Sequence, residues 1–192
     1  MPIGQAKFGL LGGVLDLDKL KLIETKTFSG VNSVEFTDLK ENIYKTHILV
    51  NHYTYQDYLN DYSFRWLLST NGGTSYITSG YAMGYQQITQ GTGFVNNYAN
   101  SRTHFEFKGA VKTISNESGA RAVGIYYIYN LGNASQYTHH VANSYNMWTT
   151  ESSYLGGGFY NTTGTINAMK FDDFGLGYNI AGKLSLYGLV NT

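Results

Sequence analysis

The chain has 192 residues, of which 18 are tyrosine, 23 are glycine and one is proline, and its length suits one sizeable β-sandwich domain. Thirteen basic and thirteen acidic side chains give a formal net charge of zero, so no positive field favours nucleic acid or an anionic membrane surface as a partner. Cysteine is absent, which excludes disulfide scaffolds and thiolate metal sites.

Residues 1–18 are expected to form an N-terminal arm. Glycines interrupt this segment, its apolar side chains follow no regular period, and it has too few continuous apolar residues for a membrane anchor. A frayed terminus is the ordinary alternative. We favour an arm that docks on a neighbouring subunit, because a solvated tail would carry more charge and less leucine. The side chains expected to dock are Ile3, Phe8, Leu10, Leu11, Val14 and Leu15.

From residue 20 onward, short runs rich in β-branched and aromatic residues alternate with turn signals, and no window shows a capped 3.6-residue period. This pattern predicts an all-β fold, a single β-sandwich of two sheets that occupies residues 19–192. The expected strands are 20–28, 33–36, 46–55, 63–68, 75–87 with breaks, 104–111, 121–129, 138–145, 154–160, 166–171 and 183–189.

Three stretches give more detailed expectations. The run 121–129 (RAVGIYYIY) is almost wholly apolar, which is typical of a strand at the centre of a sheet. In the closing strand, alternation places Leu184 and Leu186 on the inner face. The stretch 91–102 (GTGFVNNYANSR) predicts a long loop, and residues 69–73 and 116–119 predict hairpin turns.

Candidate metal ligands are few. His139 and His140 are neighbours in a predicted strand, where they would point to opposite faces and could not chelate one ion. Asp172 and Asp173, close to Gly175 and Gly177, make a weak calcium candidate, although carboxylates that cap a strand end are the more ordinary interpretation. We therefore expect no metal and no cofactor.

No nucleophile elbow, phosphate-binding loop or zinc-protease motif is present, so the sequence supplies no catalytic residues and an enzyme is not expected. Aromatic side chains are the remaining functional resource, because a Tyr or Trp ring stacks on the apolar face of a sugar. Tyr98 and Trp148 lie among polar residues and are the candidate receptor contacts, whereas Trp66, between Phe64 and Leu67, is expected in the core.

The closing 27 residues carry a resemblance to known proteins. Ile166, Met169, Lys170 and Phe171, followed by the sequence SLYG at 185–188, resemble the ending of a family of short virion proteins of tailed bacteriophages, of the marine phage and cyanophage type. The resemblance extends to residues 2–10, 22–24, 33–37 and 129–132. It implies a jelly-roll or related β-sandwich and a place in the virion, after assembly in the host cytoplasm.

The first functional hypothesis is a virion structural protein of the tail or fibre apparatus. It would assemble through its arm with other virion proteins and with copies of itself, because a neutral, Tyr-rich surface favours protein contacts. A glycan of the host cell surface is a candidate partner. The alternative is a capsid decoration (cement) or head-fibre protein, which needs the same arm and the same inert surface. A carbohydrate-active enzyme is the third class, with no residue constellation behind it.

Overall fold

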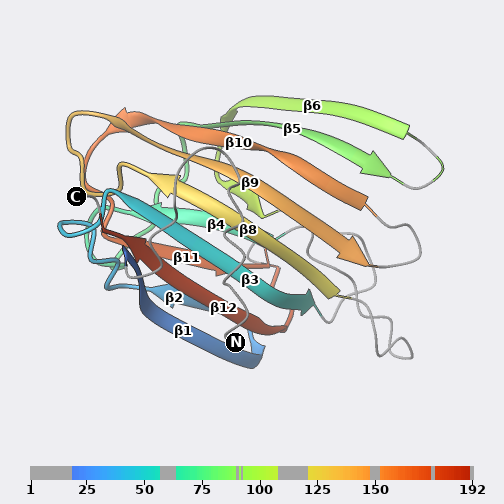
Figure 1. The fold of residues 1–192 in the computed structure, drawn as a ribbon, viewed down its shortest axis with the longest axis horizontal. Helices are drawn as coiled ribbons and strands as arrows, with labels where there is room; N and C mark the ends of the chain where they lie inside the picture. Colours follow the sequence, from blue (N-terminus) through green and yellow to red (C-terminus); the bar gives the residue numbers. More distant parts are fainter. Residues whose placement is uncertain are drawn as a thin grey trace, which may run out of the picture.

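The computed structural model describes residues 19–56, 64–89, 91, 93–107, 121–147, 152–173 and 176–190. This part of the chain forms β-strands joined by turns and loops, with no α-helix (Figure 1). The strands are β1 (Leu20–Val31), β2 (Ser33–Phe36), β3 (Thr46–Gln56), β4 (Phe64–Ser69), β5 (Tyr81–Thr89), β6 (Gly93–Arg102), β7 (Phe105–Phe107), β8 (Arg121–Tyr129), β9 (Tyr137–Met147), β10 (Ser152–Thr163), β11 (Ala168–Asp172) and β12 (Ile180–Leu189).

The strands form two antiparallel sheets, which confirms the predicted all-β sandwich. Sheet A has eight strands in the order β1-β12-β3-β8-β9-β10-β5-β6, and sheet B has four in the order β2-β11-β4-β7. Sheet A runs across the front of Figure 1, and sheet B lies behind it. β1 contacts β2 at one end of the sandwich and β5 contacts β7 at the other, so the two strand orders run in the same direction.

The core lies between the sheets and includes side chains from both. Trp66 of β4 is fully buried, as predicted, and its ring centroid lies 5.1 Å from that of Phe105 and 5.9 Å from that of Phe171. Leu184 and Leu186 of β12 are buried in the same cluster, which confirms the alternation predicted for the closing strand. Strand alternation therefore assigns the inner face of β12 correctly.

Strand β8 lies between β3 and β9 in sheet A, as its apolar sequence predicts. Its two faces have different environments. Tyr126 and Ile128 face the core and are at most 1% exposed, whereas Val123, Ile125 and Tyr127 are 38%, 41% and 41% exposed. Sheet B covers one side of sheet A, so the continuous apolar run of β8 supplies an apolar outer surface in addition to its share of the core.

Two predictions are wrong. Residues 93–102, predicted as a loop, form β6, which pairs with β5 at the edge of sheet A. β6 contributes no side chain to the core cluster, so its sequence lacks the apolar alternation that marks a half-buried strand. The turn at residues 69–73 joins no hairpin, because β4 belongs to sheet B and β5 to sheet A. The predicted turn at 116–119 lies outside the described residues.

Candidate functional site

The outer face of sheet A is the main candidate surface. Here "outer face" means the side turned away from sheet B. Large apolar side chains point outward from β8, β9 and β10, and cross-strand pairing places Tyr127 opposite Val141 and Ile125 opposite Asn143. The exposed side chains are Val123, Ile125, Tyr127, Val141, Leu155 and Phe159. Soluble monomers rarely expose large contiguous apolar patches, which usually mark interaction sites.

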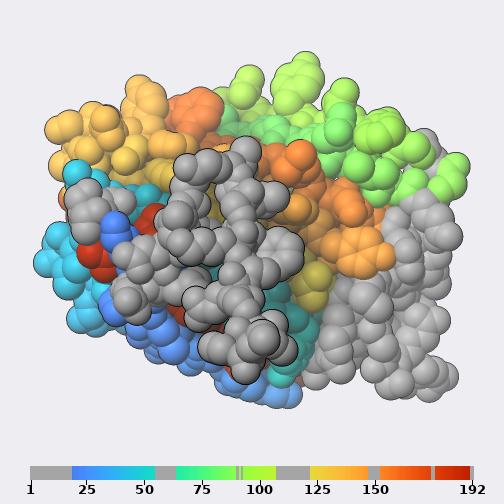
Figure 2. All heavy atoms as spheres, viewed as in Figure 1, coloured from blue at the N-terminus to red at the C-terminus, as the bar shows by residue number. Residues whose placement is uncertain are grey.

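A groove of about 420 Å³ hollows the outer face where β9, β10, β5 and β6 adjoin. We call it the glycine-floored groove, because Gly84, Gly157 and Gly158 line its base. Tyr98, Asn100, His139 and Phe159 also line it. In Figure 2 the green atoms of β5 and β6 and the orange atoms of β10 lie side by side in the upper part of this face.

The floor of the groove depends on a close backbone approach between β9 and β10. A Cβ atom added to Gly157 would lie 2.2 Å from the carbonyl oxygen of His140 on β9. Gly84 lies on β5, the other neighbour of β10, and is the Cα partner of Gly157. A Cβ atom added to Gly84 would lie 3.6 Å from its nearest neighbour, the carbonyl oxygen of Asn97, which is an ordinary van der Waals distance. Gly157 is therefore required by packing, whereas a methyl group at Gly84 would fit in ordinary van der Waals contact.

This difference gives a matched pair of variants. Gly157→Ala is expected to lower the free energy of unfolding by about 1–3 kcal/mol, the usual cost of overpacking. Gly84→Ala is expected to stay within about 1 kcal/mol of the wild type, because the new methyl group fits and alanine restricts the unfolded chain. Denaturant unfolding followed by circular dichroism compares the two variants. Equal losses would contradict the assigned packing at Gly157.

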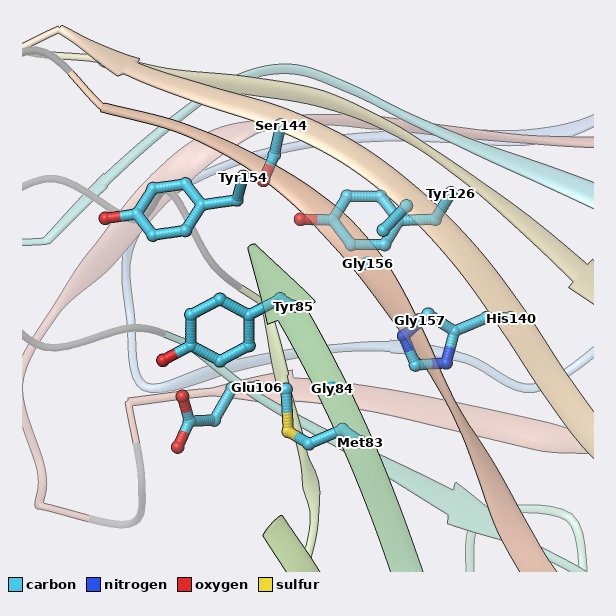
Figure 3. Close-up of a pocket in the computed structure, with 11 residues that line it drawn as sticks. Met83, Gly84, Tyr85, Glu106, Tyr126, His140, Ser144, Tyr154, Gly156 and Gly157 are labelled. Atoms are coloured by element: carbon cyan, nitrogen blue, oxygen red, sulfur yellow. The ribbon is translucent and has the colours of Figure 1, made fainter. Parts of the chain in front are cut away.

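A second, smaller cavity of about 20 Å³ lies under the groove, on the core side of sheet A (Figure 3). Figure 3 shows Tyr85, Tyr126, Tyr154, Glu106 and His140 around it. Its volume suits one water molecule and is too small for a substrate. The Glu106 carboxylate at its rim is paired with Arg102, Oε1 to Nη1 at 2.9 Å. The candidate binding site is therefore the groove rather than this cavity.

His140 separates the groove from the core and is 4% exposed. Its ring centroid lies 4.9 Å from that of Trp66 and 4.5 Å from that of Phe105. Burial, with a smaller effect of the neighbouring His139, lowers the pKa of His140 to about 3. The imidazole of His140 is therefore neutral at physiological pH and packs as an aromatic core residue.

His139, the other member of this pair, points to the outer face, which confirms that the two histidines face opposite sides of β9. Its ring stacks on Tyr129 with centroids 4.9 Å apart. His47, by contrast, is fully buried, and its Nε2 lies 2.8 Å from the carbonyl oxygen of Leu39. Burial lowers the pKa of His47.

The carboxylates of the calcium candidate are buried and engaged by protein groups. Asp172 lies opposite Arg65 in the pairing of β11 with β4, and the guanidinium donates Nε to Oδ1 at 2.8 Å and Nη2 to Oδ2 at 2.7 Å. The Lys170 ammonium lies 3.4 Å from Oδ2 of Asp172. Asp173 accepts a hydrogen bond from the backbone N–H of Tyr178. Among the described residues, no group of three or more His, Asp or Glu side chains is arranged to hold a metal ion.

Of the two candidate receptor contacts, Tyr98 lies on β6, is 85% exposed and lines the groove. Trp148 lies outside the described residues, as do the arm residues Ile3, Phe8, Leu10, Leu11, Val14 and Leu15. Sequence reasoning missed His139, Phe159, Gly84 and Gly157 as members of a shared groove. The three consecutive glycines at 156–158 were an available signal, because glycine inside a strand marks a close backbone approach.

Comparison with known proteins finds no matching family model, no matching curated protein and no matching solved structure. Within the described residues, no helical segment has the length and hydropathy of a membrane span.

Proposed function

We propose that this chain is a structural β-sandwich of a tailed-phage particle, located in the tail or fibre apparatus. In this proposal one half of the sandwich is the assembly framework, and the other half presents the glycine-floored groove outward. The observation that supports it best is the spatial distribution of the stretches that resemble phage virion proteins.

The stretches that fall within the described residues are distant in sequence and adjacent in the fold. Residues 22–24 belong to β1, which pairs with β12, and residues 33–36 form β2, which pairs with β11. The turn at 129–132 joins the same region, because the backbone N–H of Ile166 donates to the carbonyl oxygen of Leu131 at 2.7 Å. In Figure 1 these strand pairs occupy one half of the sandwich, and β5 and β6 lie at the far end of sheet A.

The exposed apolar side chains of the outer face support the same proposal. Exposed apolar side chains on neighbouring strands are typical of a protein-contact surface. Here they are 38–49% exposed and comprise Val123, Ile125, Tyr127 and Val141. Contact with other virion proteins or with further copies of the chain would remove this surface from water. Each Å² of apolar area buried in this way contributes roughly 25 cal/mol of favourable free energy. The low charge of the chain imposes little repulsion between copies.

Deletion of residues 1–17 tests the assembly role of the arm. We expect the truncated chain to stay folded and soluble, with unchanged unfolding, but to be missing from particles, because the apolar groups of the arm would be buried by a partner rather than by this core. Immunoblots of purified particles, grown with either version supplied in the host, measure incorporation.

A matched variant keeps the length of the arm and replaces its six apolar side chains with serine. This variant is expected to stay folded and to be missing from particles, as the deletion is. Unfolding of the truncated chain, or incorporation at full occupancy, would contradict the docking role. Cryo-electron microscopy of wild-type particles then locates the chain: density on the tail or its fibres supports the proposal, and density on the capsid surface indicates a decoration or head-fibre protein instead.

A further inference from the structure

We infer that the glycine-floored groove binds a neutral carbohydrate. This inference rests on the proposed function, because it names the ligand class of the face that the particle would present. It is argued from three features of the groove: its aromatic walls, the placement of its amide group and its lack of charge.

The aromatic walls are exposed, and the rings of Phe159 and His139 are held by stacking on neighbouring rings. Tyr98 is 85% exposed on one side of the groove, and Phe159 is 42% exposed on the other. Phe159 stacks with Tyr137 at 6.1 Å between centroids and 23° between ring planes. His139 is fixed in the same way by its stacking on Tyr129 at 20°. Flat rings held in one orientation suit stacking on the C–H face of a pyranose ring, with little entropy lost on binding.

Asn100 lies two positions after Tyr98 on β6, so strand alternation places it on the same face, where it lines the groove beside an irregularity in the strand pairing. Met83 pairs with Ala99 and Tyr81 pairs with Arg102, so β6 has one residue more than β5 across this interval. The extra length is taken up at Ser101, which has a positive φ of 59°. Bulges of this kind redirect a neighbouring side chain, and strained non-glycine residues are concentrated at functional sites. Asn100 contributes an amide to the lining of the groove, and an amide can both donate hydrogen bonds to sugar hydroxyls and accept hydrogen bonds from them.

Among the residues that the structure describes, the lining of the groove contains no Asp, Glu, Lys or Arg. An anionic glycan, a phosphate or a nucleic acid would find no counter-charge there, and a cationic ligand would find none either. The combination of aromatic rings, one amide and an imidazole provides apolar contact and hydrogen-bonding groups. A volume of about 420 Å³ is within the usual range of small-ligand sites. A neutral sugar matches all of these properties.

The test uses a glycan array that carries neutral hexose and N-acetylhexosamine oligosaccharides beside sialylated and sulfated ones. The full chain is clustered on a labelled antibody, so that weak single-site binding becomes measurable through avidity. We expect binding to a subset of the neutral glycans, and titration calorimetry with the strongest of these then gives the dissociation constant of the single chain.

Three variants connect binding to the groove. Tyr98→Ala removes one wall and is expected to weaken binding at least tenfold. Gly84→Ala raises the floor without a steric clash and is expected to weaken it severalfold. Phe94→Ala is the matched control, since Phe94 is 70% exposed on the same strand and the same face, about 13 Å from Tyr98 at the usual rise per strand residue. It is expected to bind like the wild type.

Three results would overturn the inference: no binding to any neutral glycan, binding to charged glycans alone, or equal binding by the Tyr98→Ala and Phe94→Ala variants. None of these results bears on incorporation into particles. Failure of the carbohydrate site is therefore distinguishable from failure of the proposed function, which the arm deletion and the localisation measure separately.

Discussion

Replacing Trp66 with alanine is expected to lower the free energy of unfolding by about 3–5 kcal/mol, the usual range for a buried Trp or Phe. Trp66 is 0% exposed and lies at the centre of a cluster of rings from both sheets. Its ring packs against Phe105 and Phe171 from sheet B and against Tyr126 and His140 from sheet A. Alanine leaves a cavity that regular strands on both sides cannot fill by small shifts.

Trp66→Phe is the matched control. It keeps an aromatic ring at the centre of the cluster and removes the indole N–H, which has no hydrogen-bond acceptor among the described residues. We expect it to cost clearly less than the alanine variant, about 1.5 kcal/mol or below. Denaturant unfolding of both variants, followed by far-ultraviolet circular dichroism, makes the comparison. An alanine variant as stable as the wild type would show that the two sheets are not joined through this side chain.

Acid is expected to destabilise the fold through His140. The unfolded imidazole has an ordinary pKa of 6.5, whereas burial lowers the pKa in the folded state to about 3. Between these values the unfolded chain binds a proton that the folded chain does not, so stability is full above pH 6.5 and falls as the pH decreases. Linkage gives a loss of about 2 kcal/mol at pH 5 and about 3 kcal/mol at pH 4 from this group.

The His140→Phe variant removes that titration. Its free energy of unfolding is expected to depend less steeply on pH. Between pH 7.5 and pH 5 the wild type should lose about 2 kcal/mol more of its free energy of unfolding than the variant does. Part of the slope remains, because burial also lowers the pKa values of His47 and His104. Phe94→Ala, which changes an exposed side chain with no titratable group, serves as the control and should keep the wild-type slope. Parallel pH profiles for the wild type and His140→Phe would contradict this assignment.

The sequence predicts a residue's environment well wherever its strand has one buried face, because apolar residues then alternate with polar ones. Alternation in β12 identifies Leu184 and Leu186 as inner residues, and the aromatic surroundings of Trp66 identify a core position. The strand β6 had no such signal. Its position is determined by backbone hydrogen bonds to β5 at the sheet edge, and those depend on register rather than on side-chain hydrophobicity.

The candidate site was less predictable than the fold, because its residues lie on strands that are far apart in the sequence and become neighbours only in the folded sheet. Gly84 of β5 and Gly157 of β10 are Cα partners although they are far apart in the chain. Asp172 and Arg65 likewise face each other across 107 positions. Local patterns identified Tyr98 as an exposed aromatic residue, but they contained no information about the strands that would lie beside it.

The difference between the core strands and the edge strand β6 also bears on how the sequence of this chain would change through mutation. No residue of β6 enters the core cluster, so Tyr98 and Asn100 are released from the packing constraints that hold Trp66 or Leu186 in place. Mutations that replace these two side chains alter one side of the groove and leave the fold intact. If the chain has the proposed function, its ligand preference would therefore change readily through mutations in β6, while the strands of the opposite half would keep the sequence that attachment to the particle requires.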